Sequence, residues 1–128
     1  MTVFFVCAGL LGLLAAGLTL NVGRMRTRKR IFLGDGGDPE MLKAIRAHAN
    51  LVELTPLCLL LIWLLHGPYG DGTIAVLAIL LTLARFAHAG GMLGMLPAGR
   101  PVGATATTAI LAIAAILLVL AGLSVRLY

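Results

Sequence analysis

The chain has 128 residues, of which 60% are hydrophobic and only 12% are charged, and its mean hydropathy is +1.04. Soluble domains are about half apolar and a quarter charged, so this composition excludes a soluble globular fold. It also excludes a disordered chain and a disulfide scaffold, because the sequence is too apolar for the first and has two cysteines only. The sequence therefore predicts an integral membrane protein. Its net charge of +5 is then explained by topology, and no nucleic-acid partner is expected.

The first apolar segment, residues 2–22, has no formal charge. As a helix it reaches about 31 Å, which is enough to cross a hydrocarbon core of roughly 30 Å. No basic segment precedes it and a basic cluster follows it, so we expect a retained membrane anchor rather than a cleaved signal peptide. Cys7 and Cys58 lie in apolar stretches and are expected to be small buried hydrophobic residues, not a disulfide.

Turn-forming residues divide the rest of the chain. Asp38 before Pro39 predicts the start of a helix, with an N-cap and a first-position proline. Loops are expected at residues 66–72 and 94–100, where glycine and proline are frequent. The sequence predicts an all-α, four-helix membrane bundle that forms one domain over residues 1–128, with spans at about 2–22, 39–65, 73–93 and 102–123.

Basic residues predict the orientation of this bundle. If the basic segment after the first span is cytoplasmic, nine of the ten Lys and Arg lie at the inner side and only Arg126 lies outside. Both termini are then outside. Trp63, Tyr69 and Tyr128 fall at the outer boundary, where interfacial aromatic residues are common. The richness in glycine and alanine and the compact loops favour a bacterial inner membrane.

Small residues recur every fourth position in the first and fourth spans, and predict flat faces for close packing between helices or subunits. These residues are Ala8, Gly12 and Ala16, and Ala104, Thr108 and Ala112.

Polar residues inside the second and third spans form the main candidate site. Arg46, Asn50 and Glu53 follow a helical spacing that places them within about 60° of one helix face. Arg85 and His88 are neighbours on the third span, and Arg85 lies at the same predicted depth as Glu53. Because a charge inside a membrane is tolerated mainly when it is paired, we expect Glu53 and Arg85 to face each other.

Further cations lie at the same inner level, at Arg24, Arg26 and Arg100. The N-termini of the second and fourth helices also point there, so the electric field favours a ligand with carboxylates or phosphate. An alternative is that Arg46 and Arg100 only reach lipid headgroups, while Glu53 and Arg85 lock the bundle.

The three histidines are ambiguous on their own. His88 fits a packing residue as well as a ligand contact. His48 lies on the opposite helix face from Asn50, and His66 lies in the outer loop, so no haem or metal site is expected.

The run from Arg46 to Pro56, with Asn50 and Glu53 inside it, closely resembles the R-A-x-x-N-x-x-E-x-x-P signature of the MAPEG superfamily. These are membrane-associated proteins in eicosanoid and glutathione metabolism. The segment 84–88 is similar to the pattern of the family's third helix, in which an arginine precedes a histidine by three residues. Arg100 stands where the fourth-helix arginine is expected, and the 33–37 loop is similar to bacterial members.

The resemblance implies a homotrimer that binds glutathione between subunits, with Arg100 stabilising the thiolate. It also implies a membrane-bound glutathione transferase or glutathione-dependent peroxidase that acts on lipophilic electrophiles. The glutathione-binding candidates are Arg24, Arg26, Arg46, Asn50, Glu53, Arg85 and His88. Two alternatives stay open: a non-catalytic protein that binds an anionic lipid or fatty-acid derivative, and a small transporter, although the latter usually needs a carboxylate in its first span.

Four positions depart from the pattern of the best-known eukaryotic members. Ala49 replaces an arginine, Met92 replaces a tyrosine, and Pro101 and Ala104 replace the Ser and Tyr of prostaglandin-forming members. Prostaglandin synthesis is therefore not expected. We expect weaker glutathione binding than in those members.

Overall fold

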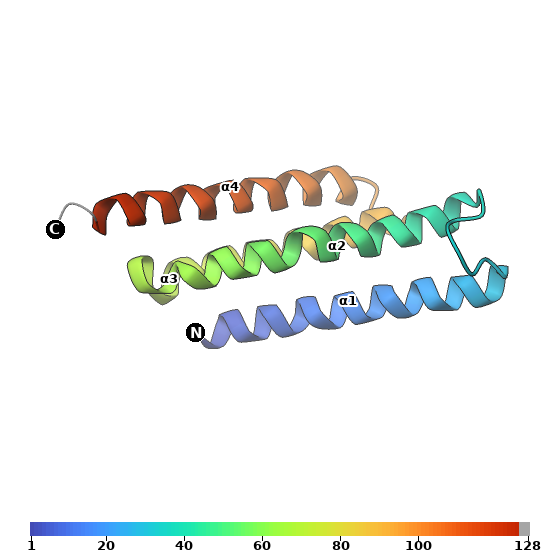
Figure 1. The fold of residues 1–128 in the computed structure, drawn as a ribbon, viewed down its shortest axis with the longest axis horizontal. Helices are drawn as coiled ribbons and strands as arrows, with labels where there is room; N and C mark the ends of the chain where they lie inside the picture. The colour runs from blue at the N-terminus through green and yellow to red at the C-terminus, as the bar shows by residue number, and fades with distance from the viewer. Residues whose placement is uncertain (126–128) are drawn as a thin grey trace.

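The computed structural model describes residues 1–125, and these form four helices in an up-and-down bundle (Figure 1). The helices are α1 (Thr2–Lys29), α2 (Pro39–Leu64), α3 (His66–Met92) and α4 (Gly99–Val125). Each is long and apolar enough to cross a membrane. The predicted all-α, four-helix architecture is confirmed.

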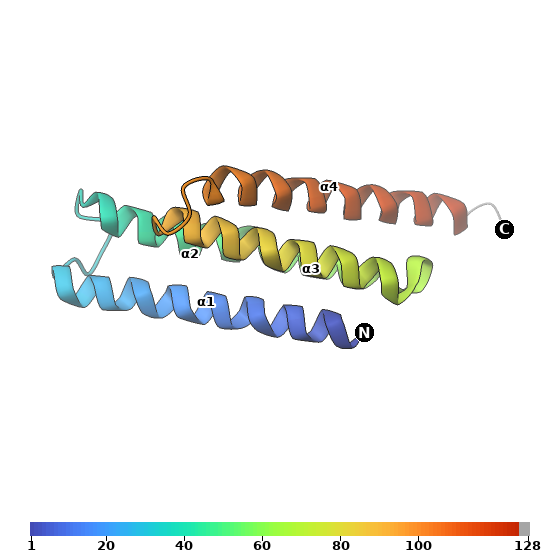
Figure 2. The same cartoon turned by 180° about the vertical axis from the view of Figure 1, so that it is seen from behind.

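The helices are not packed equally. α1 lies against α2 and α3, and α4 lies against α3 and α2, whereas α1 and α4 are not in contact within the described residues. Figures 1 and 2 show α1 and α4 on opposite sides of the central pair from both views. The main buried cluster lies between these helices and includes Leu11, Cys58, Leu81 and Ala114. As predicted, Cys7 and Cys58 are buried free cysteines.

Three glycines bring α4 unusually close to α3 at one end of the bundle. A Cβ atom on Gly91 would overlap the backbone of Arg100, and a Cβ on Gly99 would overlap the carbonyl of Ala87. On Gly103, a Cβ would lie 2.6 Å from both the Cβ and the backbone nitrogen of His88. Only glycine fits at these positions, because such contacts are far below van der Waals distance. This packing fixes the first turn of α4 against the last turns of α3.

Two helices are longer than the expected spans, and one expected loop is largely helical. α1 continues past residue 22 to Lys29, where Arg26, Arg28 and Lys29 complement the negative end of the helix dipole. α4 begins at Gly99, because Pro101 lies in the first turn, where a missing N–H costs no helical hydrogen bond. The expected loop at 66–72 is helical apart from a kink at Gly70, whose φ of 73° is readily adopted by glycine.

The connection between α1 and α2 is held by polar contacts. Asp38 caps α2 by accepting hydrogen bonds from the backbone N–H groups of Glu40 and Met41, as predicted. Lys29 Nζ lies 2.7 Å from Asp38 Oδ2 and 2.7 Å from Glu40 Oε2. The Lys29 ammonium and the helix N–H groups hold the pKa of Asp38 below its ordinary value. The cluster therefore joins the end of α1 to the start of α2.

The opposite end of the bundle carries Phe4, Trp63 and Tyr69 together with the chain start. The rings of Phe4 and Trp63 lie 5.4 Å apart, and Tyr69 Oη donates to the carbonyl of Leu117 at 3.0 Å. Asp71 binds the amino group of Met1 at 2.8 Å. Trp63 and Tyr69 thus share one end of the bundle, as expected, whereas Arg126 and Tyr128 lie outside the described residues.

The predicted small-residue faces are only partly used within the protomer. The face of α4 that packs on α3 is Gly99, Gly103 and Thr107 rather than the predicted Ala104 series. In that series Thr108 and Ala112 are exposed, as are Gly12 and Ala16 of α1. These faces remain available to lipid or to a second copy.

Candidate functional site

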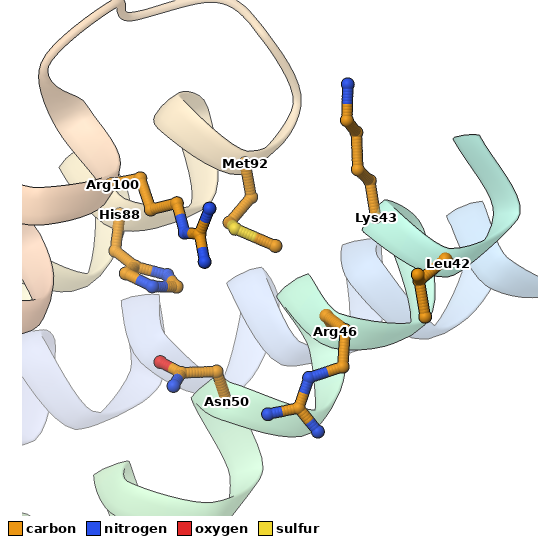
Figure 3. A pocket seen from close by; sticks show the side chains of 7 residues that line it. All are labelled: Leu42, Lys43, Arg46, Asn50, His88, Met92 and Arg100. Carbon is orange, nitrogen blue, oxygen red and sulfur yellow. The ribbon is translucent and has the colours of Figure 1, made fainter. Parts of the chain in front are cut away.

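A polar groove of about 220 Å³ lies toward the end of the bundle that carries the α1–α2 and α3–α4 connections (Figure 1), and Figure 3 shows the side chains that line it. Its walls come from the first turns of α2, the last turns of α3 and the start of α4. The residues that line it are Leu42, Lys43, Arg46, Asn50, His88, Met92 and Arg100. It therefore brings together four predicted site residues from three helices: Arg46, Asn50, His88 and Arg100.

Arg100 is placed by the glycine packing described above. It follows Gly99 in the first turn of α4, and its guanidinium extends over the groove toward His88 and Met92 (Figure 3). Its side chain is exposed, so its charge is available to a ligand. The N-terminus of α4 adds a positive dipole end at the same place.

His88 forms the buried wall of the groove. It is only 3% exposed, and its Nδ1 atom has no hydrogen-bond partner among the described residues. A buried polar atom without a partner is costly, so it marks a place where a ligand or water is expected to bind.

The predicted ion pair between Glu53 and Arg85 is wrong. Arg85 is 1% exposed and donates from Nη2 to Asn50 Oδ1 at 2.9 Å and from Nη1 to Thr107 Oγ1 at 3.5 Å. Glu53 is exposed on the outer side of α2, and among residues 1–125 no basic group lies within ion-pair distance of it. The two residues match in depth, but the 60° between Asn50 and Glu53 turns only Asn50 toward α3.

Arg85, Arg24 and Arg26 do not line the polar groove. Arg85 lies behind Asn50, and Arg24 lines a shallow surface near the end of α1. Arg26 donates to the carbonyls of Ile31 and Gly34, at 3.1 and 3.0 Å, and so holds the α1–α2 connection. Within one protomer, therefore, α1 supplies no residue to the groove.

Two polar residues of this region, Lys43 and Thr107, are absent from the sequence-based site. Lys43 lines the groove because it lies seven residues before Asn50, on the same helix face, and this spacing could have identified it. Thr107 binds Arg85 from α4, and no local pattern in the sequence distinguishes it from Thr105 or Thr108.

The groove is suited to bind an anion. Lys43, Arg46 and Arg100 provide three positive charges, and Asn50 and His88 add polar groups beneath them. Within residues 1–125, no three His, Cys, Asp or Glu side chains gather as metal ligands would. Carboxylate, phosphate or thiolate groups are the ligands that such a set of cations and N–H donors favours.

Comparison with known proteins agrees with this arrangement. The sequence model of the MAPEG family matches residues 4–120. The chain is also 41% identical over 54 residues to the inner membrane protein YecN of Escherichia coli K12, and equally to YecN of strain O6:H1. That match spans 42% of this chain and 41% of the length of YecN. Because the family match covers nearly the whole chain, this protein belongs to the MAPEG family.

Proposed function

We propose that this protein is a membrane-bound glutathione transferase or glutathione-dependent peroxidase that acts on lipophilic electrophiles. The observation that carries the proposal is the polar groove, in which Arg46, Asn50, His88 and Arg100 of the family motifs lie together. The MAPEG family includes glutathione transferases and peroxidases, and the groove has the charge that glutathione requires.

The groove residues match the carboxylates and the thiol of glutathione. The two carboxylates of glutathione suit Lys43, Arg46 and the amide of Asn50, since charge-assisted hydrogen bonds to carboxylates are the strong ones. The imidazole of His88, which lines the groove, provides a further polar group. Arg100 is our candidate for the residue beside the sulfur, where a cation lowers the pKa of a thiol.

One protomer encloses only part of such a ligand. Its groove of about 220 Å³ is smaller than the roughly 300–1,000 Å³ of ordinary ligand pockets. The glutathione ammonium also needs a carboxylate, and Glu53 faces outward from α2. We infer a homotrimer in which Glu53 of a neighbouring subunit, and its Arg24 or Arg26, complete the site. The exposed small-residue faces of α1 and α4 provide the close contact that this assembly needs.

Catalysis would consist of nucleophile activation and proximity. In the transferase reaction the thiolate sulfur forms a bond to an electrophilic carbon, and the leaving group departs with the bonding electrons. In the peroxidase reaction the thiolate attacks the terminal oxygen of a hydroperoxide and releases an alcohol. A second glutathione then reduces the sulfenic acid to give the disulfide and water. The substrate would enter from the bilayer, and the thiolate from the side of the basic residues.

A conjugation assay tests this function. The purified protein is incubated with glutathione and 1-chloro-2,4-dinitrobenzene, or with a fatty-acid hydroperoxide, and product is measured. We expect turnover with at least one substrate and a loss of about 100-fold in Arg100→Ala. Arg30→Ala is the matched control, because Arg30 carries the same charge at the same end without lining the groove. Absence of turnover with both substrates would contradict the enzymatic proposal.

A second candidate function is supported by Met92. This residue lines the polar groove where the resemblance leads us to expect a tyrosine, so the groove has one polar donor fewer and one apolar wall more. Such a groove also suits an anionic amphiphile, with its head on the arginines and its chain against Met92. Saturable binding of a fatty acid, without turnover of glutathione, would favour this non-catalytic function.

We further propose a bacterial inner-membrane location with both termini outside. The similarity to the inner membrane protein YecN supports the location, and the basic residues at the groove end support the orientation. A cysteine-free variant with Asp35→Cys should react with an impermeant maleimide only from the cytoplasmic side of inverted vesicles. Labelling of this cysteine in intact cells would contradict the proposed orientation and indicate the opposite one.

A further inference from the structure

The buried Arg85 side chain connects three helices without an acidic partner. Its guanidinium on α3 donates to Asn50 Oδ1 of α2 at 2.9 Å and to Thr107 Oγ1 of α4 at 3.5 Å. Thr107 Oγ1 in turn donates to the carbonyl of Gly103 at 2.7 Å. No carboxylate among residues 1–125 lies within ion-pair distance of Arg85.

This network fixes the chemistry of Asn50. An asparagine amide has an acceptor oxygen and a donor nitrogen, and rotation of the amide exchanges them. Arg85 is a donor only, so it holds Oδ1 of Asn50 on its own side. Asn50 lines the groove, and its Nδ2 atom makes no hydrogen bond within residues 1–125, so this donor is left for a ligand.

A purely stabilising role does not explain a cation at this position. Replacing buried ion pairs with apolar residues of similar volume is often neutral or stabilising, because taking charge out of water is costly. The core cluster of Leu18, Ala47, Leu51 and Ala89, which includes the residue one turn along α3 from Arg85, is apolar. A role in the adjacent groove explains why a charged residue occupies this position.

We propose that Arg85 is a positioning residue, which orients the amide of Asn50 so that its N–H groups donate to an anionic group of the ligand in the polar groove. This inference rests on the proposed function for its ligand. On this proposal Arg85 does not bind glutathione directly, as the sequence-based hypothesis had it, but acts on the ligand through Asn50.

Arg85→Met tests the inference in the purified, reconstituted protein. Methionine approximates the length of the side chain but cannot donate, so the Kd for glutathione should rise about tenfold, as expected for the loss of one hydrogen bond to a charged group. The midpoint of thermal unfolding should stay the same or rise. A purely structural role predicts the reverse: lower stability and unchanged Kd.

Arg85→Lys provides a second variant that keeps the charge. Its ammonium is more compact and less extended than the guanidinium, and it cannot donate to Asn50 and Thr107 through two separate nitrogens. If charge alone mattered, Arg85→Lys would bind glutathione like the natural protein. We expect the Kd to rise in this variant as well.

A double-mutant cycle separates positioning from direct contact. In an Asn50→Ala background, Arg85→Met should change the Kd by less than twofold, because the residue through which it acts is gone. Lys43→Met is the matched control, since it removes one positive charge that lines the groove at a position about two helical turns from Asn50. Its effect should be the same in both backgrounds. An undiminished effect of Arg85→Met in the Asn50→Ala background would overturn the inference.

A readout without ligand distinguishes failure of this inference from failure of the proposed function. The chain has two asparagines, Asn21 and Asn50, and no glutamine, so only two side-chain amides appear in a nitrogen–proton NMR spectrum. The Asn50 amide should be ordered in the natural protein and mobile in Arg85→Met, while Asn21 stays unchanged. If the natural protein binds no glutathione but shows this result, the orientation of Asn50 stands and only the ligand is wrong. An Asn50 amide unaffected by Arg85→Met would refute the positioning role.

Discussion

The strongest structural prediction concerns Gly103, which lies in the contact between α3 and α4. A Cβ added at this position would lie 2.6 Å from the Cβ and the nitrogen of His88 and would overlap the carbonyl of Ala84. These are largely backbone atoms of a packed helix, so α4 must move away by roughly 1 Å to restore van der Waals distances. Overpacking of this kind costs about 1–3 kcal/mol of unfolding free energy.

The same displacement should disturb the groove. His88 and Arg100 lie on the two helices that Gly103→Ala separates, and a misplacement of about 1 Å can reduce a rate about 100-fold. We therefore expect Gly103→Ala to lower both stability and glutathione conjugation. Stability is measured by thermal unfolding in detergent, followed by circular dichroism.

Gly122→Ala is the matched control on the same helix. Nothing lies within 4 Å of a Cβ at Gly122, so alanine should be neutral or stabilise the helix by about 0.5–1 kcal/mol. Equal stability of Gly103→Ala and Gly122→Ala would refute the close packing of α3 and α4.

Two further predictions concern the connection between α1 and α2 and the cysteines. Because the pKa of Asp38 is lowered in the folded protein, its stabilising effect is complete above the ordinary carboxyl pKa and is lost as the pH falls through the lowered value. The stability of the natural protein should therefore decline below about pH 4 more than that of Asp38→Asn, in unfolding measured against pH; parallel declines would contradict the role of Lys29 and the helix cap. Cys7 and Cys58 are buried, so an impermeant maleimide should label them only after denaturation in SDS. Rapid labelling of the folded protein would show that the core is open.

The helices were predictable because their signals are local. Apolar runs of about 20 residues define membrane spans, and Asp38 with Pro39 defines the start of α2. The helical segment at 66–72 was not predictable in the same way. Glycine and proline mark a turn there, yet a single positive φ at Gly70 is enough to reverse the chain, and the surrounding residues can stay helical.

The candidate site was predictable only in part, since four of the predicted residues line the groove, Arg46, Asn50, His88 and Arg100, whereas Arg24, Arg26, Glu53 and Arg85 do not. The spacing of Arg46, Asn50 and Glu53 places them on one side of α2, but a stripe 60° wide at the edge of a helix contact includes residues on both sides of that edge. Which residue faces Arg85 depends on the rotation of α2 against α3, and that rotation is set by packing along the entire helix. For this reason Asn50, not Glu53, meets Arg85.

The central proposal is that Arg100 promotes ionisation of glutathione in the polar groove. The most direct measurement is an ultraviolet difference titration of the purified protein with glutathione at neutral pH, which detects the bound thiolate by its absorbance. We expect a saturable thiolate signal in the natural protein and in Arg30→Ala, and none in Arg100→Ala. Absence of a signal at millimolar glutathione, or an equal signal in Arg100→Ala, would contradict the proposed thiolate site.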